Sequence, residues 1–137
     1  MGQLVLVCGS RTWSERDLIY LRLRKLPKES CILEGGAQGA DLMARQAALD
    51  LGLDVIEVPA NWKGRGKAAG PWRNRMMLDF KPALAIAFHG DVNLGTGTRD
   101  TVDEARRRGI PTEVILGIDA CTCAGVGDCG AKCPVHP

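Results

Sequence analysis

The chain has 137 residues, of which 45% are hydrophobic and 25% charged, and this length and composition fit one globular domain. The formal net charge of +2 is too small to indicate a nucleic-acid partner by itself, and no run of residues is long and apolar enough to cross a membrane. The N-terminal segment lacks the basic flank and the cleavage site of a signal peptide, so we expect a cytoplasmic protein whose six cysteines are free thiols or metal ligands.

Predicted strands and helices alternate along most of the chain. Short apolar runs closed by glycine, glutamate or proline are typical of buried strands, and longer stretches with apolar residues on one side are typical of helices. We expect strands at residues 3–8, 30–33, 54–58, 83–88 and 112–116. We expect helices at residues 15–26, 40–51, 71–80 and 98–108, with Ser14 as the N-cap of the first and Gly52 after the end of the second.

This alternation predicts an α/β fold with a Rossmann-like, doubly wound and mostly parallel five-stranded sheet. The domain is expected to comprise residues 1–116. Residues 117–137 are rich in cysteine, glycine and proline, and we expect them to form a separate, short cysteine-rich tail. Ligands bind such sheets at the carboxyl ends of the strands, and the glycine-rich loops after the first, second and fourth strands all lie at that edge.

The three glycine-rich loops carry groups that suit a phosphate. Glycine lets the backbone approach a ligand closely, the amides of a helix start attract an anion, and a hydroxyl or a guanidinium adds hydrogen bonds. Each loop taken alone is weak evidence, and Asp41 suits a helix start as well as a ribose contact. Because the loops share one edge, binding is the better interpretation. The candidate ligand contacts in these loops are Gly9, Ser10, Arg11, Glu34, Gly35, Gly36, Gly39, Asp41, Gly95, Gly97 and Thr98.

Four motifs occur in an order that resembles a known family. They are Val-Cys-Gly-Ser-Arg at 7–11, Glu-Gly-Gly-Ala-Gln-Gly-Ala-Asp at 34–41, Gly-Pro-Trp-Arg-Asn-Arg-Met-Met at 70–77 and Gly-Thr-Gly-Thr at 95–98. Over residues 3–116 the chain resembles the SLOG superfamily of Rossmann-like domains, in its small stand-alone YspA-like branch, which occurs in bacteria and phages. The resemblance implies a pocket for a nucleotide or a nucleotide-derived small molecule, with Arg73 and Asn74 among its contacts.

The resemblance also raises the question of catalysis, because the superfamily includes the Lonely Guy enzymes, which cleave the N-glycosidic bond of nucleoside monophosphates. Their motif places a catalytic glutamate where this chain has Thr101, whereas their arginine is kept as Arg73 and the lysine after it is lost. Threonine cannot supply the carboxylate that stabilises an oxocarbenium ion or activates water. Substitutes for it, Asp100, Asp103 or Glu104, would require a shifted helix. We therefore expect a binding or sensing protein without catalytic residues, and a nucleotide-processing hydrolase is the first alternative.

Residues 62–75 carry five basic side chains and no acidic one, and this stretch also contains Trp62 and Trp72. Basic residues beside aromatic ones suit single-stranded nucleic acid. They suit equally a flap that closes over one polyphosphate ligand, and we rank this interpretation first. Trp72 is at a predicted helix start and fits a core position as well. Single-stranded nucleic-acid binding is therefore the second alternative, and a homo-oligomer is left open as a further partner.

The tail has its own candidate ligands, which are Cys121, Cys123, Cys129, Cys133 and His136. Four thiols and an imidazole within sixteen residues are enough for one tetrahedral zinc ion. The spacing lacks a pair of cysteines with two residues between them, which is usual in zinc sites. A disordered tail and a disulfide hairpin are the alternatives, and we place zinc first.

Overall fold

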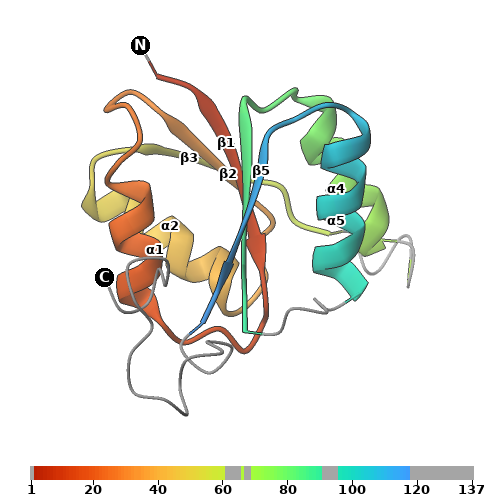
Figure 1. The fold of residues 1–137 in the computed structure, drawn as a ribbon, viewed down its shortest axis with the longest axis horizontal. Helices are drawn as coiled ribbons and strands as arrows, with labels where there is room; N and C mark the ends of the chain where they lie inside the picture. Colours follow the sequence, from red (N-terminus) through yellow and green to blue (C-terminus); the bar gives the residue numbers. More distant parts are fainter. Residues whose placement is uncertain (1, 61–65, 67–68, 91–95, 118–137) are drawn as a thin grey trace, which may run out of the picture.

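A computed structural model of the chain describes residues 2–60, 66, 69–90 and 96–117, and a parallel sheet runs through its middle (Figure 1). The strands are β1 (Leu4–Gly9), β2 (Cys31–Glu34), β3 (Asp54–Glu57), β4 (Leu84–His89) and β5 (Thr112–Leu116). The helices are α1 (Arg16–Leu23), α2 (Ala40–Asp50), α4 (Ala69–Asp79) and α5 (Thr96–Arg107).

The sheet has the strand order β3-β2-β1-β4-β5, and all four neighbouring pairs are parallel. The chain builds outward from β1 to one edge, then crosses over and builds from β4 to the other edge. As a result α1 and α2 cover one face of the sheet, and α4 and α5 cover the opposite face (Figure 1). This is the doubly wound, Rossmann-like α/β fold that the sequence predicts. The order reverses between β1 and β4, which is the point where such sheets bind ligands.

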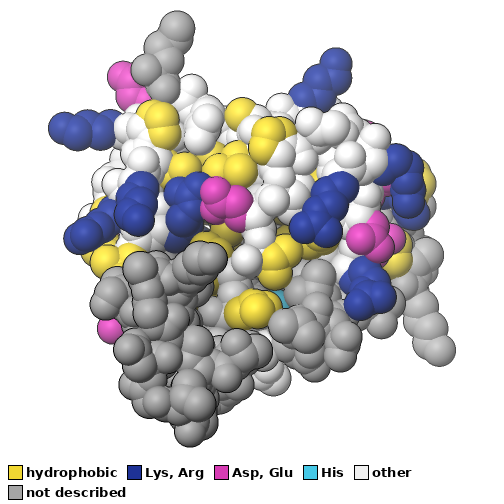
Figure 2. All heavy atoms as spheres, in the orientation of Figure 1, with side chains coloured by type: hydrophobic (Ala, Val, Ile, Leu, Met, Phe, Trp, Pro, Cys, Tyr) yellow, Lys and Arg dark blue, Asp and Glu magenta, His cyan; other side chains and the backbone are white. Residues whose placement is uncertain are grey.

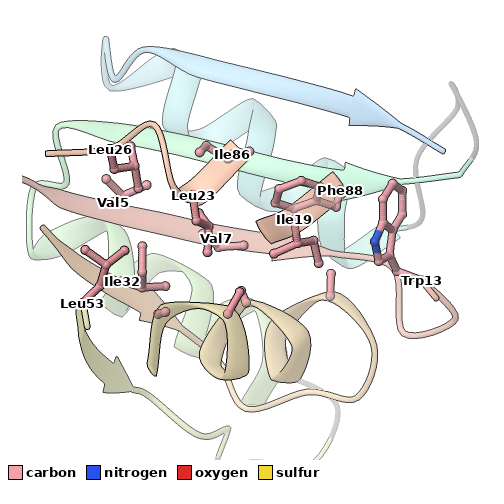
Figure 3. Packing of buried hydrophobic residues seen from close by; sticks show 14 residues of the cluster. Val5, Val7, Trp13, Ile19, Leu23, Leu26, Ile32, Leu53, Ile86 and Phe88 are labelled. Carbon is pink, nitrogen blue, oxygen red and sulfur yellow. The ribbon is translucent and has the colours of Figure 1, made fainter. Parts of the chain in front are cut away.

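Alternate residues of each central strand enter two separate apolar layers. Val5 and Val7 of β1 pack beneath α1 and α2, whereas Leu6 and Cys8 pack beneath α4 and α5. A parallel sheet covered on both faces requires such apolar strands. Figure 3 shows the layer beneath α1 and α2. In this layer the ring of Trp13 meets Phe88 edge-on, with the ring centroids 5.5 Å apart.

Two helix starts differ from the sequence prediction. Ser14 does not cap α1, whose N-cap position is Glu15 and has no side-chain hydrogen bond. The reason is that Trp13 enters the core and donates its Nε1–H to the Glu15 carbonyl at 2.9 Å, which delays the helix. Helix α5 begins at Thr96, two residues earlier than expected. Both Thr96 and Gly97 therefore belong to its first turn rather than to a loop.

The surface seen in the orientation of Figure 1 has mixed charge. Lys and Arg side chains are scattered among neutral and apolar atoms in Figure 2, and acidic side chains lie beside several of them. Arg22 of α1, for example, pairs with Glu113 of β5 at 2.8 Å. None of the helices in the described part of the chain is long and apolar enough to span a membrane.

Candidate functional site

The first glycine-rich loop packs directly against the second at the carboxyl edge of the sheet. The Ser10 amide donates to the Phe88 carbonyl at 2.9 Å, and the Ala40 amide donates to the Ser10 carbonyl at 3.1 Å. A Cβ on Gly9 would collide with the Phe88 carbonyl, and one on Gly39 would collide with the Ser10 carbonyl. These two glycines therefore let protein segments approach each other closely.

The polar groups of the first loop are partly used within the loop itself. The Ser10 and Thr12 hydroxyl oxygens are 2.8 Å apart, and the Thr12 amide donates to the Ser10 hydroxyl at 3.1 Å. Arg11 is exposed, and its charge opposes the rise in the pKa of Asp41 that burial causes.

The second loop is held by a buried carboxylate and an arginine. Asp41 Oδ2 accepts hydrogen bonds from the amides of Gly35 at 3.0 Å and Ala37 at 3.4 Å. Arg73 Nη1, from α4, donates to the Gly35 carbonyl at 2.7 Å. A Cβ on Gly35 would collide with the Arg73 guanidinium. Arg73 therefore holds the carbonyl of Gly35, and Asp41 holds its amide.

Burial raises the pKa of the Asp41 carboxyl to about 6, against the opposing effects of Arg73, the two backbone amides and Arg11. Asp41 therefore keeps its negative charge at neutral pH. Two positive charges, on Arg73 and Arg11, act on this carboxylate. Glu34 also lies close enough for its charge to interact with that of Asp41.

The carboxylate of Glu34, at the end of β2, contacts the backbone of the second loop. It is 0% exposed, and its Oε2 accepts a hydrogen bond from the Gly36 amide. Its Oε1 is buried and has no hydrogen-bond partner among the described residues. Burial, together with the nearby charges of Asp41 and Glu57, raises the pKa of Glu34 to about 7, although the Gly36 amide and Arg45 oppose the shift. Glu34 is thus a structural support of the loop.

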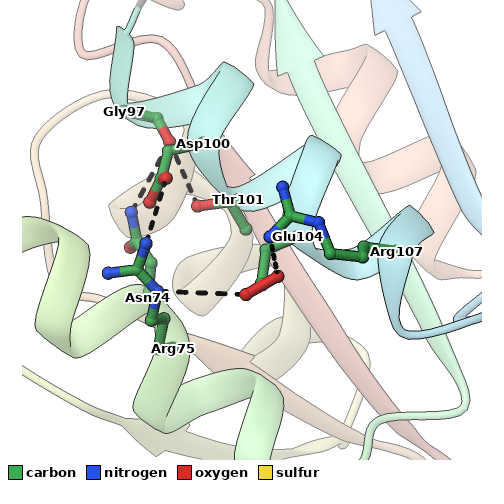
Figure 4. Close-up of polar contacts among 7 residues, drawn as sticks. All are labelled: Asn74, Arg75, Gly97, Asp100, Thr101, Glu104 and Arg107. Atoms are coloured by element: carbon green, nitrogen blue, oxygen red, sulfur yellow. Dashed lines mark hydrogen bonds and ion pairs between the residues drawn. The ribbon is translucent and has the colours of Figure 1, made fainter.

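A chain of hydrogen bonds connects Arg73 to the start of α5. Arg73 Nε donates to Asn74 Oδ1 at 2.9 Å, and Asn74 Nδ2 donates to the Gly97 carbonyl at 3.5 Å. The Thr101 hydroxyl donates to the same carbonyl at 3.1 Å (Figure 4). Asn74 and Thr101 are both buried. The first turn of α5 is therefore held in place relative to the Arg73 guanidinium.

Gly97 is the open position of the site. It is exposed, and a Cβ built on it would meet no heavy atom within 4 Å. Thr98, the next residue, is buried. The first amides of an α-helix have no partner within the helix and carry a partial positive charge, so they attract anions. The space beside Gly97 thus lies at a helix start that suits a phosphate.

The acidic side chains of α5 are engaged with arginines. Arg75 of α4 lies 3.9 Å from both Asp100 Oδ1 and Glu104 Oε1. Glu104 Oε2 also pairs with Arg107 at 2.7 Å (Figure 4). Thr101, at the position of the Lonely Guy glutamate, is 1% exposed and bonded within its own helix. Both Asp100 and Glu104 thus serve contacts between α4 and α5.

The described candidate residues lie near one edge of the sheet, but they differ in what they contact. The residues assembled around the second loop and the start of α5 are Gly35, Asp41, Arg73, Asn74, Gly97 and Thr98. Five other candidates make contacts with further protein segments, and these are Gly9, Ser10, Glu34, Gly36 and Gly39. Gly95 lies outside the described residues.

Sequence analysis missed Glu57 and Arg45, which influence the charge of Glu34. A Cβ on Gly36 would collide with the Glu57 carboxylate. Glu34 and Glu57 are paired in register at the ends of adjacent parallel strands. The signal was present in the sequence, because Glu34 directly follows the predicted strand 30–33 and Glu57 lies one residue before the end of the next predicted strand, 54–58.

No metal site is found in the part of the chain that the structure describes, where no group of three or more histidine, cysteine or acidic residues comes together. Cys8 is buried, and burial raises the pKa of its thiol, so it stays protonated. The predicted zinc ligands Cys121, Cys123, Cys129, Cys133 and His136 lie outside the described residues. Zinc in the tail stays a prediction, and elemental analysis of untagged protein kept reduced and free of chelator tests it.

The strand order and the packed helices define a Rossmann-like α/β domain. Its polar loops meet at the carboxyl edge of the sheet, where the strand order reverses. The chain belongs to the YspA, cpYpsA-related SLOG family, whose model matches residues 4–64. It is 33% identical over 116 residues to the Gene 61 protein of Mycobacterium phage D29, a match that covers 78% of this chain and 91% of the phage protein.

A solved structure with a similar fold is DNA processing protein A (DprA) from Streptococcus pneumoniae. The TM-score is 0.71 at 22% sequence identity, and the match covers 93% of this chain. This chain spans 54% of the DprA chain, about half its length. The likeness establishes the fold.

Proposed function

We propose that this protein binds a nucleotide or a nucleotide-derived small molecule through its phosphate, between Arg73 and the first turn of α5. The observation that carries the proposal is the hydrogen-bonded connection from Arg73 through Asn74 to the Gly97 carbonyl. It fixes a guanidinium relative to a helix start beside which there is open space. A guanidinium fork and helix amides are both favourable partners for phosphate oxygens.

The charges at this edge support the same conclusion. Arg73 donates two of its N–H groups to Gly35 and Asn74, and a guanidinium carries further N–H groups beyond these. Arg73 and Arg11 both lie close enough to Asp41 to oppose the rise in its pKa that burial causes. Both guanidinium groups would attract a dianionic phosphate bound at this edge. Membership of the SLOG family and the DprA-like fold are consistent with a nucleotide-related or nucleic-acid-related role.

Titration calorimetry with nucleoside monophosphates and diphosphates tests the proposal. Arg73→Lys keeps the positive charge but removes the planar fork, so we expect nucleotide affinity to fall about tenfold or more. Arg106→Ala removes an exposed charge from the last turn of α5 and is the matched control, with unchanged affinity. A folded Arg73→Lys variant with wild-type affinity, or no binding of any nucleotide by the wild type, would contradict the proposal.

The same samples test the hydrolase alternative. With Thr101 buried and bonded to Gly97, we expect no release of free base from nucleoside monophosphates. Chromatography of a long incubation measures it. Base release that disappears in Asp41→Asn would favour the enzyme.

A second candidate function, binding of single-stranded nucleic acid, is favoured by Trp72. This side chain is 50% exposed at the start of α4, next to Arg73 in the chain, so the interpretation of Trp72 as a core residue is wrong. An exposed aromatic ring beside arginine can stack on a base. The similar fold of DprA, named as a DNA processing protein, supports this candidate at the level of fold alone.

Fluorescence anisotropy with a labelled single-stranded oligonucleotide separates the two candidates. If Trp72 stacks on a base, Trp72→Ala weakens binding by about 1–3 kcal/mol. The control is Phe80→Ala, because Phe80 is similarly exposed near the other end of α4. Equal binding by wild type and Trp72→Ala would exclude stacking by this residue.

A further inference from the structure

We propose that the outer surface of α1 and α2 binds a second copy of this chain, in a two-fold dimer in which each helix runs antiparallel to its copy. This inference is independent of the nucleotide site. The two helices enclose an open groove of about 630 Å³ on the face away from the sheet. The residues that line it include Arg16, Asp17, Tyr20, Leu42, Met43 and Gln46.

Exposed apolar side chains gather on these two helices. Among the described residues, eight large hydrophobic side chains are markedly exposed, and half of them belong to α1 and α2. These four are Tyr20, Leu21, Leu42 and Leu49. Leu49 is the most exposed of the eight, at 54%. Apolar groups gathered on one exposed surface mark an association site more often than scattered ones do.

Two exposed side chains of opposite charge flank the apolar centre of α1, Asp17 in its first turn and Arg24 at its C-cap. Asp17 precedes Tyr20 by three residues, and Arg24 follows Leu21 by three residues. Residues seven apart are separated by about two helical turns and lie on the same side of a helix. A second antiparallel copy of α1 would therefore place Asp17 against Arg24 of the partner subunit. Both side chains are exposed.

Helix α2 has the same seven-residue spacing between Leu42 and Leu49. An antiparallel copy of α2 places Leu42 against the partner's Leu49. The midpoint between Asp17 and Arg24 falls between Tyr20 and Leu21, and that between Leu42 and Leu49 falls between Arg45 and Gln46. Tyr20 and Gln46 line the same groove. One two-fold axis across the groove thus satisfies the charged pair and the leucine pair together. Such self-complementarity is what an isologous dimer requires, and it is why we assign the surface to a second copy of this chain.

A charge-swap experiment on the full chain tests the dimer. Sedimentation velocity is measured over a hundredfold range of concentration in reductant, so that tail cysteines cannot cross-link. We expect wild type to associate reversibly to a dimer and Asp17→Arg to weaken association about tenfold or more, because it opposes the partner's Arg24. The double variant Asp17→Arg/Arg24→Asp restores association. A wild type that is monomeric throughout, or a double variant as weak as the single one, would overturn the proposal.

A second pair of variants tests the surface without altering α1. Leu49→Glu places a charge in the apolar contact and is expected to abolish the dimer. Phe80→Glu makes the same kind of change on α4 and leaves the dimer intact. The reverse result, with Phe80→Glu monomeric and Leu49→Glu dimeric, assigns the interface to α4 and overturns the proposal. Melting curves confirm that each variant is folded, as expected for changes at exposed positions.

Discussion

Glycines on the β1–β2 side of the carboxyl edge lie against other protein atoms, whereas Gly97 on the β4 side faces open space. A Cβ on Gly9, Gly35 or Gly39 would collide with a carbonyl or with the Arg73 guanidinium. A Cβ on Gly97 would meet nothing within 4 Å. The difference shows that a glycine-rich loop does not by itself mark a ligand. In this chain the closed glycines let protein segments pack closely at this edge, whereas Gly97 has open space beside it, where we propose that the ligand binds.

The largest expected effect on stability comes from the β1–β2 side, where the glycines lie against other protein atoms. Gly39 has φ +78, a conformation that side chains rarely adopt, and its Cβ would also collide with the Ser10 and Arg11 carbonyls. Gly39→Ala is therefore expected to lower the free energy of unfolding by about 3 kcal/mol. Denaturant unfolding measures it.

Gly52 provides the matched control for this change. It has φ +77, but a Cβ there would meet nothing within 4 Å. Gly52→Ala is expected to cost only about 1 kcal/mol, the strain of the backbone alone. Equal costs for Gly39→Ala and Gly52→Ala would mean that the contact between the two loops is not tight.

Glu34, which is also on the β1–β2 side, is expected to have a smaller effect on stability that depends on pH. Its pKa is about 7 in the folded protein against an ordinary value of 4.5, so the folded state binds its proton more tightly than the unfolded state does. Stability contributed by this group is therefore present below about pH 4.5 and is lost as the pH rises to about 7. The loss is expected to be about 2 kcal/mol.

Glu34→Gln tests this account because glutamine resembles the protonated acid. The variant is expected to lose less stability than wild type between about pH 5 and pH 8. Glu29→Gln, at an exposed position, is the control and keeps the wild-type dependence. The pKa of Asp41 is also raised, so this residue likewise makes stability fall as the pH rises, at lower pH and in all three proteins. Parallel pH curves for wild type and Glu34→Gln would contradict the assignment.

Gly97→Ala tests the β4 side, where the glycine has open space beside it. It is expected to have the smallest effect on stability. Alanine is a better helix former than glycine, so the variant is expected to be more stable by about 0.5 kcal/mol. Its methyl group would occupy the space where we place the phosphate, so nucleotide affinity is expected to fall about tenfold. Melting curves and calorimetry measure the two effects. An Ala variant that binds as tightly as wild type would place the ligand elsewhere.

The sequence was sufficient to predict the order and type of the elements. Apolar runs marked the strands, and Gly52 marked the end of α2, where its positive φ confirms the prediction. What local patterns could not reveal was which distant groups fill each loop. Gly36 lies against Glu57 and Gly39 against Ser10 because the strand order places those segments side by side. For the same reason Glu34, predicted as a ligand contact, is buried and contacts the backbone of its loop.

Amide nitrogen–proton correlation spectra during titration with a nucleoside monophosphate test the central claim most directly. The account predicts the largest shifts at the amides of Gly97 and Thr98 and at the side chain of Arg73, with small shifts at Tyr20 and Gln46 in the groove of α1 and α2. Saturable shifts confined to that groove, or no shifts at any amide, would contradict it.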